Sequence, residues 1–151
     1  MEYVIEKHTK SWVPTSRDNS FSNQLIDAYM NGKRDGVQQY KSLEISKLNE
    51  NINKSGTITV NIINILKEKK ISPIDAYLRV HSFERFDIMV TVPENDYLKD
   101  EFLDIYDIIS DFEEKSKDDF YSAFISICST NNHFDEQIVA SDGYALKLAK
   151  K

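Results

Sequence analysis

A carboxylate in the middle of a β-strand, with other acids near the ends of the sheet, is an arrangement that can hold a divalent metal ion. Asp87 has such a place in the segment 85–92, whose alternating apolar residues predict a strand. The remaining ligands would come from acids later in the chain: Asp135, Glu136 and Asp142. Such a site would suit a small metal-dependent enzyme acting on phosphodiesters or nucleotides. An Asp87 that faces solvent or pairs with Arg85 explains the same pattern, and we favour that interpretation.

Histidine next to a carboxylate offers a second kind of chemistry. His133 lies two residues before Asp135 in a polar turn, where the pair could ligate a metal or transfer a proton. Asp87 and His133 are therefore the candidate catalytic residues. His81 is expected at the edge of the core, and Cys128 as a buried structural thiol. No motif identifies a reaction, a ligand or a protein family, so we expect no cofactor and favour a protein without enzymatic activity.

The clearest single pattern is an amphipathic helix predicted over residues 95–114. Its apolar residues fall within about 80° of arc at the helical spacing, which predicts one buried stripe. That stripe consists of Leu98, Phe102, Ile105, Ile109 and Phe112. The opposite stripe is wholly acidic and consists of Asp96, Asp100, Asp104, Asp107, Asp111 and Glu114.

The acidic stripe suggests a binding surface. Four of its residues are the candidates for docking a basic protein or mimicking a phosphate backbone: Asp100, Asp104, Asp107 and Asp111. The alternative is an outer face that only contacts solvent. The net charge is −6, and residues 72–151 hold 17 acids against 8 basic residues. Because this acidic part repels nucleic acid and anionic lipid, we expect neither as a partner.

The N-terminal part is predicted to be helical. Apolar residues at helical spacing predict one helix over 21–53, or two pieces divided near Gly32 and Gly36, which Asn53-Lys54-Ser55-Gly56 would end. Its near-heptad spacing would support a homodimer. A shorter helix over 57–70, for which a strand is the alternative, is expected to pair antiparallel with it. Before these helices, Tyr3-Val4-Ile5 could form a strand, and Trp12-Val13-Pro14 is expected to be a loop.

The C-terminal part mixes helices and strands. Ser72-Pro73 has the pattern of a helix start, so a short helix is expected over 72–81. A strand over 85–92 follows, then the acidic helix, then a strand over 120–129 parallel to the first. Asp142-Gly143 predicts a hairpin between strands 136–141 and 144–148.

These elements predict an α+β fold, with a helical N-terminal half packed against a two-layer C-terminal half and the helix 95–114 on one face of a mixed sheet. We expect one domain over 1–151, with a possible sub-division near residue 71 into 20–70 and 72–151. With one cysteine, no signal-like start and no long apolar run, the chain is expected in the cytoplasm. Its frequent Ile, Asn, Lys and Asp residues are typical of proteins encoded by an AT-rich genome, which suggests a bacterial or phage origin.

The functional hypothesis that follows is a non-enzymatic intracellular protein that binds another protein. The metal-dependent enzyme is the alternative. A nucleic-acid-binding accessory protein is a third option, which would use two groups of lysines: Lys67, Lys69 and Lys70, and Lys147, Lys150 and Lys151. Neither group forms a basic stripe interleaved with aromatic residues, so this option has the least support.

Overall fold

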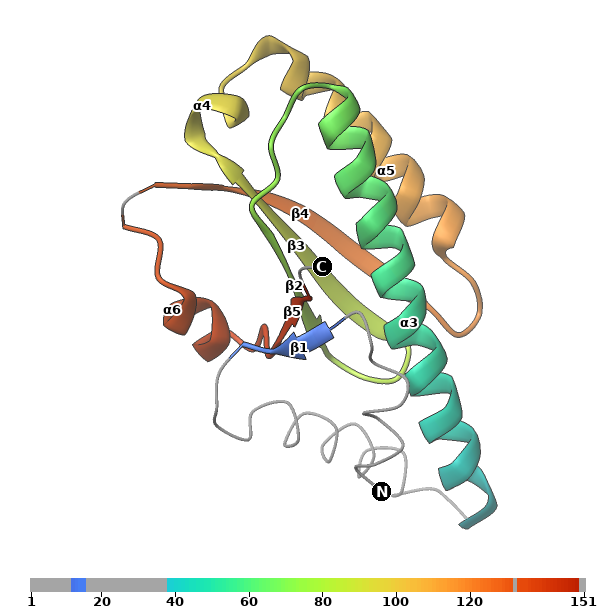
Figure 1. The fold of residues 1–151 in the computed structure, drawn as a ribbon. Helices are drawn as coiled ribbons and strands as arrows, with labels where there is room; N and C mark the ends of the chain where they lie inside the picture. The colour runs from blue at the N-terminus through green and yellow to red at the C-terminus, as the bar shows by residue number, and fades with distance from the viewer. Residues whose placement is uncertain (1–11, 16–37, 132, 150–151) are drawn as a thin grey trace.

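A mixed five-stranded sheet is the centre of the fold (Figure 1). The computed structural model describes residues 12–15, 38–131 and 133–149. The strands are β1 (Trp12–Pro14), β2 (Asp75–Val80), β3 (Arg85–Pro93), β4 (Ser122–Thr130) and β5 (Leu146–Leu148), in the order β1-β5-β2-β3-β4. β3 and β4 are parallel and the other neighbours antiparallel. The predicted α+β class and the parallel pair are confirmed.

Two helices, α3 (Gln38–Glu68) and α5 (Leu103–Ser116), cover one face of this sheet (Figure 1). The strands turn their predicted apolar stripes towards these helices, because alternate residues of a strand share a face. One cluster of buried residues results, and it joins α3, α5 and the sheet across residue 71. Its members include Ile52, Ile62, Leu66, Leu78, Ile88, Val90, Ile105 and Ile125.

The helix end predicted at residues 53–56 is wrong, because α3 continues through it. Ser55 and Gly56 are buried, and the small side chains let the helix pack closely against its neighbours. The Ser55 Oγ lies 2.8 Å from the Tyr121 hydroxyl, at a buried contact. Packing therefore outweighs the helix penalty of about 1 kcal/mol for glycine. Residues 57–68 are helical as predicted, but as part of α3 rather than as an antiparallel partner.

The region predicted to support a homodimer is only partly described. Residues 1–11 and 16–37 lie outside the described residues. The segment Tyr3-Val4-Ile5 and most of the predicted helix over 21–53 therefore lie outside them too. Within the described part, Leu48 and Ile52 are buried in this chain's own core. The homodimer remains a prediction, but these two apolar residues are already used within the chain.

The helix predicted over 72–81 is wrong, because residues 75–80 form strand β2. This strand pairs with β3 along its whole length and with β5 at Tyr77 and Leu78. Ala76 and Leu78 face the core, whereas Tyr77 is buried on the opposite face. A central strand that is buried on both faces lacks a simple alternating pattern, and pairing on both sides outweighs the local helix-start signal.

The predicted hairpin around Asp142-Gly143 is also wrong. Residues 136–141 form a short helix, α6 (Glu136–Ser141), whose first turn is capped because the Asp135 carboxylate accepts the Gln137 N–H at 2.9 Å. Gly143 has a φ of 99°, and its N–H bonds to the Ala140 carbonyl, which ends the helix. The strand predicted over 144–148 is confirmed only as β5, which pairs with β2 and with β1.

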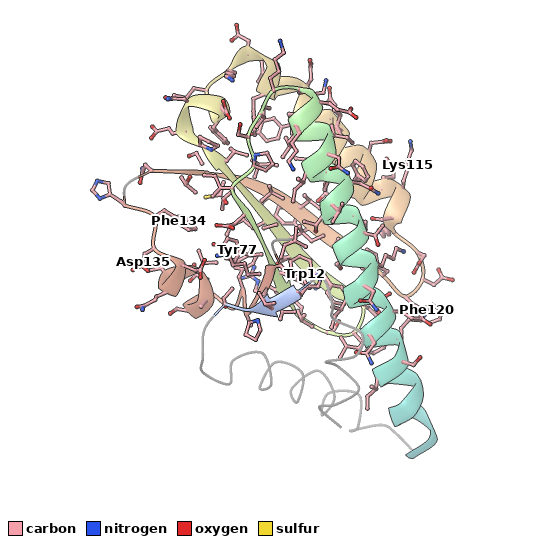
Figure 2. The ribbon with its side chains drawn as sticks, viewed as in Figure 1. Trp12, Tyr77, Lys115, Phe120, Phe134 and Asp135 are labelled. Atoms are coloured by element: carbon pink, nitrogen blue, oxygen red, sulfur yellow. The ribbon has the colours of Figure 1, made fainter. Side chains whose placement is uncertain are left out.

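The segment Trp12–Pro14, expected to be a loop, is strand β1 at one edge of the sheet. The Trp12 ring is buried, and its Nε1 donates to the Ile52 carbonyl of α3 at 3.2 Å (Figure 2). A large aromatic side chain that packs between sheet and helix stabilises this strand in a way that turn-forming neighbours do not reveal. No helix in the described ranges is both long and apolar enough to cross a membrane.

Candidate functional site

The helix predicted over 95–114 consists of three pieces. They are α4 (Glu94–Tyr97), the 3-10 helix η1 (Asp100–Phe102) and α5. The first break is at residues 98–99, next to Asp96, whose carboxylate accepts the Ser72 N–H at 2.9 Å and forms an ion pair with Lys99 at 2.7 Å. These two contacts hold the pKa of Asp96 below its usual value, the Lys99 hydrogen bond contributing more. Asp96 is thus part of a local structural link and not of an outer acidic stripe.

The core side of α5 is as predicted in its main part. Ile105 and Ile109 are buried, Phe102 just before the helix is buried, and Phe112 packs against the same cluster. Leu98, predicted as the first residue of this stripe, is instead 71% exposed, because the break at residues 98–99 changes its direction. The buried residues fix the rotation of α5 and so decide which side chains face outwards.

The outward side of the acidic helix carries the predicted protein-binding residues. Asp100, Asp104, Asp107 and Asp111 are all exposed. The surface is not free of cations, because Lys115 pairs with Asp111 at 2.9 Å and extends outward from α5 (Figure 2). The hydrogen bond to Asp111 raises the pKa of Lys115.

Apolar side chains interrupt this acidic surface, which corrects the prediction of a wholly acidic face. Leu103 is 70% exposed in the first turn of α5, and Tyr106 is exposed one turn later. Asp104 follows Leu103 directly, and Asp107 lies one helical turn away from it. An exposed leucine beside carboxylates can pack against an apolar anchor while the acids attract basic residues around it. We call Leu103, Asp104, Tyr106 and Asp107 the α5 surface.

Asp87 lies on the sheet face opposite α3 and α5, and it is 8% exposed. One interpretation of the sequence paired its carboxylate with Arg85. In the structure the carboxylate pairs instead with residues of the neighbouring strand. Arg79 is the direct cross-strand neighbour, and its Nε donates to Asp87 Oδ2 at 2.8 Å. His81 Nε2 lies 2.6 Å from the same oxygen. Arg85, at the start of β3, is exposed.

Arg79 connects this cluster to the segment after α6. Its Nη1 donates to the backbone carbonyl of Asp142 at 2.9 Å, and its guanidinium lies 4.7 Å from the centroid of the Tyr144 ring. Burial raises the pKa of the Tyr144 hydroxyl. The charge of Asp87 is therefore balanced within the structure, and the cluster holds the C-terminal segment against the sheet. An imidazole that is oriented by a carboxylate, as His81 is by Asp87, can act as a base. Here the Arg79 guanidinium contacts the same carboxylate oxygen, so Asp87 is not dedicated to orienting His81.

The structure does not bring the predicted metal and catalytic residues together. His133 is exposed in a turn, where its backbone N–H donates to the Asn131 side-chain oxygen. Asp135 caps α6, and Asp142 contacts Arg79 only through its backbone carbonyl. Within the described ranges, no group of three or more His, Cys, Asp or Glu residues is placed to hold a metal ion. The half-buried Cys128 thiol donates to the adjacent Ser129 carbonyl at 3.4 Å.

A further polar cluster, which the sequence did not indicate, holds α6 against the sheet. The Tyr77 hydroxyl and the Lys147 ammonium both donate to Glu136 Oε2 at 2.8 Å. Burial, followed by the hydrogen bond to Glu136, raises the pKa of Tyr77. The Phe134 ring packs beside Tyr77, with the centroids 6.4 Å apart (Figure 2). This cluster could not be found from sequence, because both β2 and α6 were assigned to the wrong kind of element.

Comparisons with protein families, with curated proteins and with solved structures find no match to this chain.

Proposed function

We propose that this chain is a non-enzymatic cytoplasmic protein that docks a basic protein partner on the α5 surface. One observation carries the proposal, which is the exposed Leu103 beside Asp104 and Asp107 on the outward side of α5. The residues that face the core fix this orientation, so the leucine cannot turn inwards without displacing Ile105 and Ile109. The single cysteine supports a reducing compartment.

The expected energies explain why both kinds of residue are needed. An exposed ion pair contributes about 0.2–1 kcal/mol, so carboxylates alone would give weak and salt-sensitive binding. Burial of a leucine side chain contributes about 1.5–3 kcal/mol. A partner that covers Leu103 with an apolar side chain and places lysine or arginine near Asp104 and Asp107 would use both terms.

The metal-dependent alternative has less support from the geometry. Asp87, which would anchor the metal, already contacts Arg79 and His81 through one oxygen. Asp135 acts as a helix cap instead. A role in stabilising the fold therefore accounts for the contacts around these residues.

Site-specific photo-crosslinking tests the proposal. A photoreactive amino acid would replace Leu103 in the full chain, made in the cells in which it naturally occurs. A matched position is Ile138, which is 59% exposed on α6. We expect crosslinks from position 103, and not from position 138, to one protein with a basic surface, identified by mass spectrometry.

The crosslinked protein would then be purified and mixed with the unmodified chain. Direct association of the two purified proteins, weakened by salt, is the expected result. Equal crosslinking from positions 103 and 138, an acidic crosslinked protein, or the absence of any crosslink from position 103 would each contradict the proposal.

A further inference from the structure

The outer edge of β4 has hydrogen-bonding groups that face away from the sheet. β4 is the last strand in the order of the sheet, with β3 on its inner side. The Ile125 N–H points outwards, because it donates to the Glu113 carboxylate of α5 at 2.9 Å. Backbone groups alternate in direction along a strand, so Ala123, Ile127 and Ser129 also present theirs outwards.

At one position of this edge, the Glu113 carboxylate accepts the hydrogen bond that a neighbouring strand would accept. A neighbouring strand would offer a backbone carbonyl to the Ile125 N–H, and the Glu113 carboxylate supplies an oxygen there instead. Within the described ranges, no hydrogen bond links the outward backbone groups of Ile127 or Ser129 to another segment. Among the described residues, the edge is therefore satisfied at Ile125, and further along no other segment pairs with it, the Ser129 carbonyl accepting only from the thiol of Cys128 in the same strand.

The sequence of β4 does not protect this edge. Exposed edge strands usually carry a charged residue or a proline that prevents pairing with another chain. The nine residues of β4, SAFISICST, contain neither. Phe124 is 63% exposed on the sheet face opposite α3 and α5, so an apolar side chain lies directly beside the edge.

Charge selects the occupant of this edge. The segment Leu103–Ser116, whose Glu113 reaches the edge, contains five acids and one lysine. A second copy pairing through β4 would bring two such acidic helices to the same edge. A basic segment would instead be attracted to it.

We propose that an extended basic segment of the protein partner adds to β4 as a sixth strand. Its backbone carbonyl would accept the Ile125 N–H, and Glu113, released from that hydrogen bond, would pair with a lysine or arginine of the segment. Apolar residues of the segment would contact Phe124 on the other face. This inference rests on the proposed function, because it assigns a binding mode to the same basic partner.

The test uses the full ¹⁵N-labelled chain and two synthetic peptides of nine residues, one alternating valine with lysine and one alternating valine with glutamate. Amide hydrogen exchange is measured by NMR. With saturating Val/Lys peptide, we expect exchange at Ile127 and Ser129 to slow at least tenfold. The Val/Glu peptide is expected to leave exchange unchanged.

Two variants separate backbone pairing from general attraction. Ser129→Pro removes one outward N–H from an edge position where proline is tolerated, and Ser129→Ala keeps it. We expect the proline variant to bind the Val/Lys peptide about tenfold more weakly than the alanine variant, a difference of about 1.4 kcal/mol. Amide spectra of both variants report whether the sheet remains intact.

Several results would overturn strand addition. They are equal protection by both peptides, equal affinity of the two Ser129 variants, or slow exchange in the free protein that depends on its own concentration, which would indicate a second copy. If the Val/Lys peptide shifts only the amides of Leu103 and Asp107, strand addition fails and the proposed docking function survives. If it shifts neither site, both fail.

Discussion

Removal of the Asp87 carboxylate tests whether this residue has a structural role. In Asp87→Ala, the Arg79 guanidinium and the His81 ring lose the oxygen that they share. A hydrogen bond to a charged group contributes about 1.5–3 kcal/mol. The side chains of Arg79 and His81 are 32% and 41% exposed, so water replaces part of the lost contact. We therefore expect a loss of about 2–3 kcal/mol in the free energy of unfolding.

Urea denaturation monitored by fluorescence measures this loss, and Arg85→Ala is the matched control. Arg85 is exposed and two residues away on the same strand, so its removal is expected to change stability by less than about 0.5 kcal/mol. A second control replaces both partners, as Arg79→Met with Asp87→Leu. The double variant should be more stable than Asp87→Leu alone, because no charge remains unpaired.

The structural role of Asp87 is refuted if Asp87→Ala lowers the free energy of unfolding no more than Arg85→Ala. Asp87 would then be held in place without contributing to stability, which is typical of residues kept for function. The candidate metal site would regain support in that case, and metal titration of the wild type against Asp87→Asn would be the next measurement.

Three further substitutions test the packing. Tyr121→Phe should lower the free energy of unfolding by about 1 kcal/mol in urea denaturation, because it removes the buried contact with Ser55. An unchanged midpoint would contradict this. Since burial raises the pKa of Tyr121 to about 12, its hydroxyl should resist ionisation in an absorbance titration of the folded protein. Asp96→Asn should destabilise by about 1 kcal/mol at neutral pH. Because the folded pKa of Asp96 is lowered, its contribution is present above its ordinary pKa of about 3.9 and disappears as pH falls through the folded value, so the variant and wild type should converge in acid; a constant difference would show another cause. Gly143→Ala should cost about 1–2 kcal/mol, because its φ is 99°, and a thermal midpoint equal to that of wild type would disprove this strain.

The sequence predicted the elements whose burial is one-sided. β3 and β4 alternate between core and opposite face, and α5 has one apolar stripe, so their periodicities reveal their kind. β2 was missed because residues on both of its faces are buried, including Tyr77 and Leu78. α6 was missed because the Asp142-Gly143 turn that ends it is also typical of a hairpin. Local signals were ambiguous there, and pairing across the sheet decided the outcome.

Prediction of the candidate site was limited by the same causes. Spacing alone placed Asp100, Asp104, Asp107 and Asp111 on the outward side of the acidic helix, and all are exposed. Leu103 was missed because only the apolar and acidic stripes were followed, although the same helical spacing places Leu103 outside the apolar stripe. The partners of Asp87 were missed because β2, which carries Arg79 and His81, was predicted to be a helix. A cross-strand contact cannot be derived when one of its strands is not recognised.

The affinity of the chain for its crosslinked partner tests the docking proposal most directly. Calorimetry would compare wild type, Leu103→Ser, and the double variant Asp104→Asn with Asp107→Asn. The control double variant, Glu68→Gln with Glu94→Gln, makes the same change in net charge at exposed positions elsewhere.

We expect Leu103→Ser to weaken binding about tenfold or more, as the loss of a buried leucine requires. The aspartate variant should weaken binding and reduce its dependence on salt, whereas the control should match wild type. If all four proteins bind with the same affinity, the α5 surface does not dock the partner and the proposed function is wrong.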